Sequence, residues 1–247
     1  MSNAETIKNT KTGNASTDHP ANSPMIDDIS GKTRHWSSIA GVNNNALKPI
    51  SGISAALKRF EDFVLGSIAL LIIFPLMLLI SLIIKLDSTG PALFCQARSG
   101  RNREVIKVYK FRTMYQNGSQ EFRQAEKDDP RITRVGSFLR RTSLDELPQL
   151  FNVIQGSMSL VGPRPHPLKL DEEFKYIIPA LSSRYAVKPG ITGWAQINGF
   201  RGETRQVSDM VQRIEHDRDY VKKWSLWLDI KILFMTVLKG WTHKNAY

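Results

Sequence analysis

Two adjacent carboxylates, Asp145 and Glu146, stand in the stretch 139–152, which reads LRRTSLDELPQLFN. A carboxylate can attack phosphorus and so divide one difficult group transfer into two easier steps. A structural interpretation is also open, because Ser143 and Glu146 ahead of an apolar run match the capping-box pattern. In that pattern both side chains bind free backbone N–H groups at a helix start. The pair therefore indicates a catalytic site, a helix cap, or both.

Pro148 decides where this helix is expected to begin. With Ser143 as the cap, Pro148 would lie inside the helix, where its missing N–H and its ring are both unfavourable. A start at about Leu144 or Asp145 puts the proline in the first turn, where it is tolerated. The carboxylates then lie at the positive end of the helix dipole, which favours bound phosphate and ionised side chains.

Four cations of the sequence could neutralise a phosphate. Lys110 and Arg112 belong to the β-branched and aromatic segment 103–114, for which we predict a strand, and their spacing puts both on one face. Arg140 ends a predicted helix, and Arg164 stands between two prolines that stiffen the chain. Each cation also has a structural alternative. Lys110 and Arg112 could belong to a solvated strand face, and Arg140 could stabilise a helix C-terminus. The turn that holds Arg164 could be a structural corner alone.

The chain has 247 residues, with 34 Lys and Arg against 23 Asp and Glu, and a net charge of +11. This surplus indicates an anionic partner, such as nucleic acid, an acidic membrane surface or a phosphorylated substrate. Because no zinc-finger or RNA-binding spacing is present, we expect no nucleic-acid partner. The single cysteine, Cys95, excludes an internal disulfide and a cluster of thiolate ligands.

The run 63–84 is apolar and uncharged throughout, and it reaches the roughly 20 residues of a membrane-spanning helix. Pro75 lies near its middle, where the ring removes a backbone bond and predicts a bend. Lys58 and Arg59 precede the run and further cations follow it, so neither end resembles an outside flank. A hairpin that enters and leaves by the same face satisfies both observations, although a straight span stays open.

Residues 1–54, rich in small polar side chains, predict a disordered N-terminal extension. Residues 55–86 form the predicted re-entrant anchor, and 87–247 the catalytic domain. Within it, the segment 224–241 is rich in Trp, Leu and Ile, and predicts a helix in the membrane interface or in the core. The expected fold is α+β and mainly helical, with interfacial amphipathic helices and a small β element around a site at the membrane surface.

Four stretches occur together and in the order found in one family: KRFEDF (58–63), KFRTM (110–114), LRRTSLDELPQLFNVIQGSMSLVGPRP (139–165) and KPGITGWAQINGFRGE (188–203). Over about residues 55–247 the chain resembles the bacterial sugar transferases, the monotopic phosphoglycosyl transferases that act on polyprenyl phosphate. Its ending, with KKWSLWLDIKIL and HKNAY, is similar to that of members that transfer hexose-1-phosphate and start exopolysaccharide repeat units.

The resemblance implies an enzyme on the cytoplasmic face of the bacterial inner membrane, in contact with membrane lipids. A UDP-sugar loses UMP as its sugar phosphate moves to an aspartate, and polyprenyl (undecaprenyl) phosphate then accepts it. By motif position, the resemblance implies that Asp145 is the nucleophile and the residue that contacts Mg²⁺, the family's metal. Glu146 would be its partner in a catalytic dyad.

The resemblance also assigns roles to basic residues and to the helix break. Arg140 matches the family's phosphate-binding arginine, and Arg164 stands in its Pro-Arg-Pro turn. Lys58 and Arg59 match the basic pair beside the re-entrant helix. Pro75 follows a phenylalanine where the family often has a serine, so the break would depend on the proline alone.

Several alternatives stay open. The C-terminal pattern favours glucose-1-phosphate, with galactose next and an N-acetylhexosamine third. A membrane-anchored module that binds anionic lipids without turnover would also explain the basic composition, but it would have no use for the acidic pair. A homodimer is a further expectation.

Overall fold

The computed structural model describes residues 25–27, 33–35, 47, 50–115, 129–202 and 207–239. It divides the chain into two units, Met1–Val42 and Asn43–Tyr247. In the first unit, β1 (Met25–Asp27) and β2 (Thr33–His35) pair antiparallel, a pairing that the sequence did not predict. Most of the predicted disordered extension lies outside the described residues.

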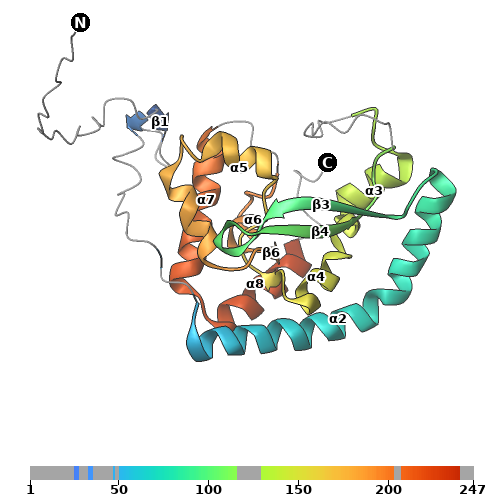
Figure 1. Ribbon diagram of the computed structural model, residues 1–247, viewed down its shortest axis with the longest axis horizontal. Coiled ribbons are helices and arrows are strands. Elements are labelled where there is room, and N and C mark those ends of the chain that lie inside the picture. Colours follow the sequence, from blue (N-terminus) through green and yellow to red (C-terminus); the bar gives the residue numbers. More distant parts are fainter. Residues whose placement is uncertain are drawn as a thin grey trace, which may run out of the picture. The chain divides into compact units, whose positions relative to one another are not determined.

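One long helix, α2 (Gly52–Asp87), contains Pro75. Figure 1 shows that α2 changes direction in its second half, the half that contains the proline. A proline inside a helix removes a backbone hydrogen bond and bends the axis, as the sequence predicted. Among the described helices, α2 is the one long and apolar enough to cross a membrane, and 17% of its most apolar stretch is buried.

The two faces of α2 differ in their surroundings. Its C-terminal half buries Met77, Ile80 and Ile84 against Phe111 and Leu139. Large apolar side chains elsewhere on the helix are exposed: Ile53, Leu57, Phe60, Leu71, Ile72, Leu79 and Leu86. An apolar surface of this length on a water-soluble protein would be unusual, which agrees with a membrane-associated helix.

Strands β3 (Leu93–Ser99) and β4 (Val105–Phe111) pair antiparallel, with Phe94 opposite Lys110. The predicted strand within 103–114 is therefore confirmed. Its partner β3 was missed, because the glycine and proline ahead of it were interpreted as turn residues only. The hairpin sets the position of the Lys110 side chain.

The helices that follow are all shorter than α2. They are α3 (Arg134–Thr142), α4 (Gln149–Gln155), α5 (Leu168–Phe174), α6 (Trp194–Ile197), α7 (Val207–Lys223) and α8 (Leu226–Lys239), with 3-10 turns η2 (Arg101–Arg103), η3 (Leu144–Glu146) and η4 (Pro179–Ala186). The main core contains Val108, Leu150, Val153, Met158, Leu160, Val161, Val187, Ile197, Tyr220, Val221 and Ile232. The fold is thus mostly helical with small sheets and one long apolar helix near its start.

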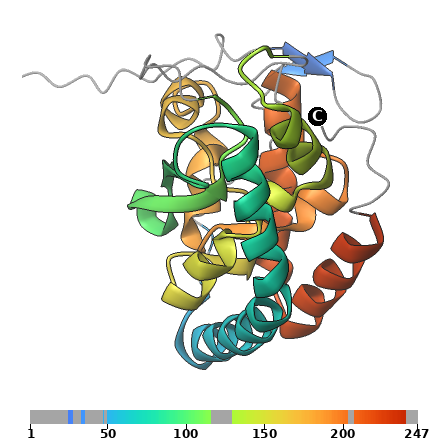
Figure 2. The same ribbon diagram turned by 90° about the vertical axis from the view of Figure 1, so that its right-hand side faces the viewer.

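Strands β5 (Ser159–Val161) and β6 (Gly190–Thr192) pair in parallel at the centre of this core. Their approach is close, because a Cβ on Gly190 would lie 2.1 Å from the backbone nitrogen of Gly162. Helix α8 lies beside the N-terminal part of α2 (Figure 2) and buries Ile232 in the core. Its Trp227 is 77% exposed. One face of the segment is therefore core, as one alternative predicted, and the other is an exposed apolar surface. A place in the membrane interface stays a prediction.

Candidate active site

The turn η3 carries both candidate carboxylates between α3 and α4. Ser143 ends α3 in the left-handed conformation, with φ 59°, and its side chain makes no capping hydrogen bond. Helix α4 begins only at Gln149, with Pro148 as the residue before it. The capping-box interpretation is therefore wrong. At Leu144, where a helix was predicted to begin, the structure has the 3-10 turn η3, and the helix α4 follows it.

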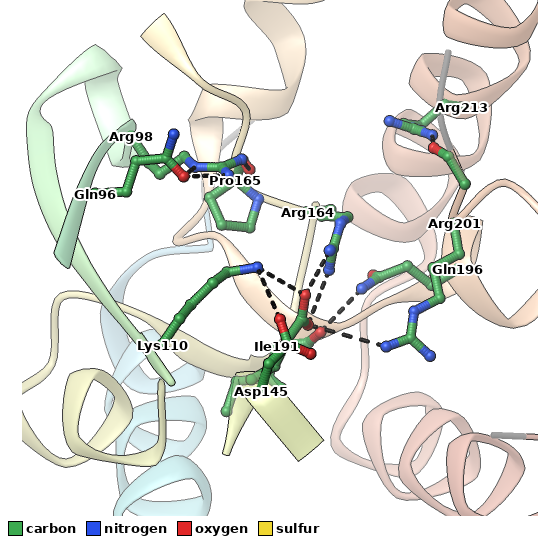
Figure 3. Close-up of polar contacts among 12 residues, drawn as sticks. Gln96, Arg98, Lys110, Asp145, Arg164, Pro165, Ile191, Gln196, Arg201 and Arg213 are labelled. Carbon is green, nitrogen blue, oxygen red and sulfur yellow. Dashed lines mark hydrogen bonds and ion pairs between the residues drawn. The ribbon is translucent and has the colours of Figure 1, made fainter. Parts of the chain in front are cut away.

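Glu146 is held by three cations from separate parts of the chain. Arg164 donates from Nη1 to Oε2 at 3.0 Å and from Nη2 to Oε1 at 2.5 Å. The Lys110 ammonium, from β4, donates to the same Oε1 at 3.0 Å, and Arg201 Nη2 lies 4.0 Å from Oε2. Figure 3 shows these side chains converging on the carboxylate pair. Both oxygens of Glu146 are thus engaged.

Asp145 lies beside this cluster but is paired more weakly, with Oδ2 3.9 Å from Lys110 Nζ. Burial raises the pKa of Asp145 above its usual value, although the charges of Lys110 and, less strongly, Arg164 and Arg140 oppose that rise. Burial would also raise the pKa of Glu146, but Arg164 and Lys110 hold it well below the usual range. The two neighbours therefore differ: Glu146 is a fixed anion, and Asp145 is the more basic carboxylate.

The loop after β5 holds Arg164 through its backbone. Arg184 Nη2 donates to the carbonyl oxygen of Arg164 at 2.5 Å, and Arg98 Nη1 donates to that of Pro165 at 2.9 Å. Arg184 is itself anchored by the buried carboxylate of Asp217, 3.1 Å away. The turn that two prolines stiffen is thus fixed further by Arg98 and the buried Arg184, and the Arg164 side chain pairs with Glu146.

The family model described as bacterial sugar transferase matches residues 53–243. The chain belongs to this family.

Three relatives illustrate the range of similar proteins. A UDP-glucose:undecaprenyl-phosphate glucose-1-phosphate transferase of Escherichia coli strain K12 is 52% identical over 200 residues, 81% of this chain and 43% of that protein. One of the same name from Caulobacter vibrioides is 47% identical over 191 residues, 77% of this chain and 72% of that protein. A UDP-N-acetylgalactosamine-undecaprenyl-phosphate N-acetylgalactosaminephosphotransferase of Aeromonas hydrophila is 44% identical over 188 residues, 76% of this chain and 44% of that protein. The chain spans less than half the length of the first and third.

In this member of the family the structure gathers five of the predicted site residues: Lys110, Arg140, Asp145, Glu146 and Arg164. Sequence reasoning assigned no role to two arginines near them, Arg98 and Arg201. Arg201 falls within the glycine-rich stretch KPGITGWAQINGFRGE, which carried the family resemblance without indicating this residue. Arg98 lies in β3, the strand that was missed.

The structure does not bring Arg112 to the site. Strand β4 ends at Phe111, and the Arg112 guanidinium turns to the C-terminus of α2, where it donates to carbonyl oxygens of Ser88 at 2.6 Å and Thr89 at 2.7 Å. A cation that binds the free carbonyls at a helix end stabilises that end. The expectation that Lys110 and Arg112 form one phosphate clamp is therefore wrong.

Lys58 and Arg59 also lie away from the carboxylate pair. The Lys58 ammonium is 2.9 Å from a carboxylate oxygen of Asp62 and 2.8 Å from one of Asp229. Arg59 donates to two carbonyl oxygens near the end of α4, at 2.6 Å each. Both side chains join α2 to the rest of the fold, and neither contacts Asp145 or Glu146.

The donor set at the carboxylate pair fits a magnesium ion shared with a substrate. Among the described residues, no group of three or more His, Cys, Asp or Glu could hold a metal alone. Mg²⁺ commonly takes one or two protein carboxylates and completes its shell with substrate phosphates and water. The oxygens of Glu146 are occupied, whereas Asp145 has one long ion pair. Asp145 is thus the carboxylate whose oxygens are available to coordinate a metal ion.

Proposed function

We propose that this chain transfers a hexose-1-phosphate from a UDP-sugar to undecaprenyl phosphate and releases UMP, through a covalent intermediate on Asp145. The observation that carries the proposal is a carboxylate pair, Glu146 buried and Asp145 partly buried, that lies among three cations in a chain of this family. A module that only binds anionic lipids would be weakened by these carboxylates, because each repels a phosphate.

In the first step, a carboxylate oxygen of Asp145 attacks the phosphorus that carries the sugar. A P–O bond to Asp145 forms, the P–O bond to the bridging oxygen breaks, and UMP leaves with that electron pair. Burial supports this role for Asp145, because it makes the carboxylate more basic. Lys110 and Arg164 are close enough to neutralise charge that develops on the phosphate oxygens.

In the second step, a phosphate oxygen of undecaprenyl phosphate attacks the same phosphorus. The P–O bond to Asp145 breaks, the carboxylate is regenerated, and the product is an undecaprenyl diphosphate-linked sugar. Glu146 is not consumed in either step. Its role in the dyad is to hold Arg164 and Lys110 in place while the phosphates exchange.

Magnesium is the proposed metal, held by Asp145 together with phosphate oxygens of the substrate. When bound, it would neutralise phosphate charge and so favour attack by an anion. Arg140, whose charge acts on Asp145, is the proposed additional contact for the diphosphate.

Glucose is the favoured sugar, because relatives named for glucose-1-phosphate transfer reach 52% identity. An N-acetylhexosamine is the alternative that a specific observation supports, since the Aeromonas relative named for N-acetylgalactosamine is 44% identical. Galactose remains the other alternative. A panel of UDP-sugars, each assayed for UMP release with undecaprenyl phosphate present, would separate them.

The proposed location is the cytoplasmic face of the bacterial inner membrane, with α2 as a re-entrant anchor and α8 in the interface. Both helices expose large apolar side chains, and α2 changes direction as a re-entrant helix must (Figure 1). This arrangement would bring a soluble sugar nucleotide and a lipid phosphate to one site. The product would be the first membrane intermediate of a glycan such as an exopolysaccharide.

Asp145→Asn tests the proposal. It keeps the side-chain shape but removes the nucleophilic oxygen. We therefore expect the rate of UMP release to fall by at least about 1,000-fold, as rates do when catalytic side chains are removed from other enzymes. Asp219→Asn, on the exposed side of α7, is the matched control and should retain full activity. Near-normal UMP release by Asp145→Asn, with the protein still in the membrane fraction, would exclude the assignment. Absence of UMP release in the unaltered chain would favour the lipid-binding module.

A further inference from the structure

A second cluster of cations lines a cavity of about 50 Å³ at the N-terminal part of α2. This volume is several times the roughly 10–15 Å³ that one water molecule needs. The charged residues of its wall are Lys58, Arg59, Asp62, Arg101 and Lys188. None of them contacts Asp145 or Glu146, so the cavity is separate from the catalytic cluster.

Two of these cations and the carboxylate already have partners. Lys58 is paired with Asp62 and Asp229, and Arg59 with carbonyl oxygens of α4. Asp62 also accepts hydrogen bonds from the hydroxyl of Ser159 at 3.0 Å and from a backbone N–H at 2.9 Å. Its negative charge is therefore satisfied within the fold.

Arg101 and Lys188 are different. The structure records no hydrogen bond or ion pair between either side chain and another described residue, and Arg101 Nε is buried without an acceptor. Burial and the nearby charge of Arg59 lower the pKa of Lys188, and the carboxylate of Asp62 opposes that shift only in part. Four cations line the cavity, and its one carboxylate is already paired, so an anion in the cavity would relieve the repulsion among the cations.

The position of the cavity on α2 indicates what anion it meets. Ile53, Leu57 and Phe60 form an exposed apolar stripe, while the cavity residues of the same turns lie on the opposite face of the helix. If the stripe faces the acyl chains, the cavity lies about one helix diameter away, roughly 10–12 Å, which is the level of lipid headgroups.

We propose that this cavity is a phosphate-binding site for an anionic membrane lipid, with Arg101 and Lys188 as its ligands. Guanidinium and ammonium groups are the usual protein partners of phosphate oxygens. The site would fix the depth and orientation of α2 at the membrane surface. It rests on the proposed membrane association and not on the proposed catalytic activity.

The test is a thermal-unfolding titration of the full chain in an uncharged detergent. The probes are dihexanoyl phosphatidylglycerol, dihexanoyl phosphatidylcholine and inorganic phosphate. We expect phosphatidylglycerol to raise the unfolding midpoint most. In the double variant Arg101→Gln with Lys188→Gln, its apparent affinity should fall at least about tenfold, because two charge-assisted hydrogen bonds are lost. Arg101→Lys with Lys188→Arg should restore most of the affinity.

The control is Lys107→Gln with Lys169→Gln, which removes two exposed lysines and should bind as the unaltered chain does. Lys169 lies in α5, on the side of the unit away from the N-terminal part of α2 (Figures 1 and 2). If the double glutamine variant fails to fold, Lys188→Gln alone should weaken binding about fivefold.

Equal phosphatidylglycerol affinity in the glutamine variant and the unaltered chain would overturn the proposal. Equal stabilisation by inorganic phosphate would assign the cavity to a soluble anion and overturn the lipid assignment. Equal stabilisation by phosphatidylcholine would show that the cavity does not recognise anionic charge, and this result would also overturn the lipid assignment. Asp145→Asn should bind phosphatidylglycerol normally, so a failure of this site and a failure of the catalytic proposal give different results.

Discussion

At the scale of single residues, the site separates two adjacent carboxylates into different electrostatic states. The longer side chain of Glu146 reaches Arg164 and Lys110 and accepts hydrogen bonds from both, while Asp145 stays 3.9 Å from the nearest ammonium. Sequence reasoning predicted that both would lie among cations. It could not predict which carboxylate would be neutralised, because that depends on where the arginine of a distant loop arrives.

A buried carboxylate beside this loop gives a pH-dependent prediction. Burial alone would raise the pKa of Asp171, but its hydrogen bond with His166, together with smaller contributions from Ser99 and nearby positive charge, outweighs that effect and lowers the pKa to about 2. The usual aspartate value is about 3.9, so the ionised form is favoured by folding. Its stabilising contribution is therefore fully present above about pH 4 and is lost as the pH falls from about 4 to about 2.

We expect Asp171→Asn to reduce the free energy of unfolding by about 2 kcal/mol at pH 6, with a smaller loss at pH 3. Urea unfolding at both pH values measures the difference. The exposed change Asp219→Asn should alter stability by less than about 0.5 kcal/mol at either pH. An Asp171→Asn loss that is independent of pH would show that the lowered pKa is not the cause.

At the scale of elements, short strands and turns decide which side chains meet. The segment 103–114 has β-branched and aromatic residues and was predicted as a strand, whereas β3 has no comparable pattern and is a strand only because it pairs with β4. The end of β4 at Phe111 also determines that Lys110 faces the site and Arg112 faces α2. A two-residue periodicity cannot show where pairing stops.

The close contact between β5 and β6 is a second element-scale feature, and Gly190→Ala tests it. The added Cβ would lie 2.1 Å from the backbone nitrogen of Gly162, and backbone on both sides cannot move away without breaking the pairing. We expect a loss of about 2–3 kcal/mol in the free energy of unfolding, as for an overpacked core. Chemical denaturation of the purified chain measures this.

Gly199→Ala is the comparison, because a Cβ added there would meet no atom within 4 Å, whereas the φ of Gly199 is +97°. Backbone strain alone should cost roughly 1–2 kcal/mol at this position. If Gly190→Ala cost no more than Gly199→Ala, the close approach of the strands would not be limiting.

At the scale of the whole second unit, the exposed apolar faces of α2 and α8 agree with the proposed membrane association. A re-entrant α2 predicts that both of its ends lie on the cytoplasmic side. Ser51 and Thr89 are exposed polar residues just beyond those ends. In a Cys95→Ser background, Ser51→Cys and Thr89→Cys should each react with an impermeant thiol reagent only after the inner membrane is opened. Labelling of either cysteine from the outside of intact spheroplasts would indicate a straight span.

The sequence by itself determined the family, the acidic pair and the apolar helix with its proline. Each of these is a local property, either a contiguous motif or a run of similar residues. The tertiary structure decided which cations lie at the carboxylate pair. Arg201 lies beside Glu146, whereas Arg112, Lys58 and Arg59 bind other parts of the fold. The physical reason is that these pairings join residues far apart in the chain. Their formation depends on backbone positions and on burial, which no local pattern of charges contains.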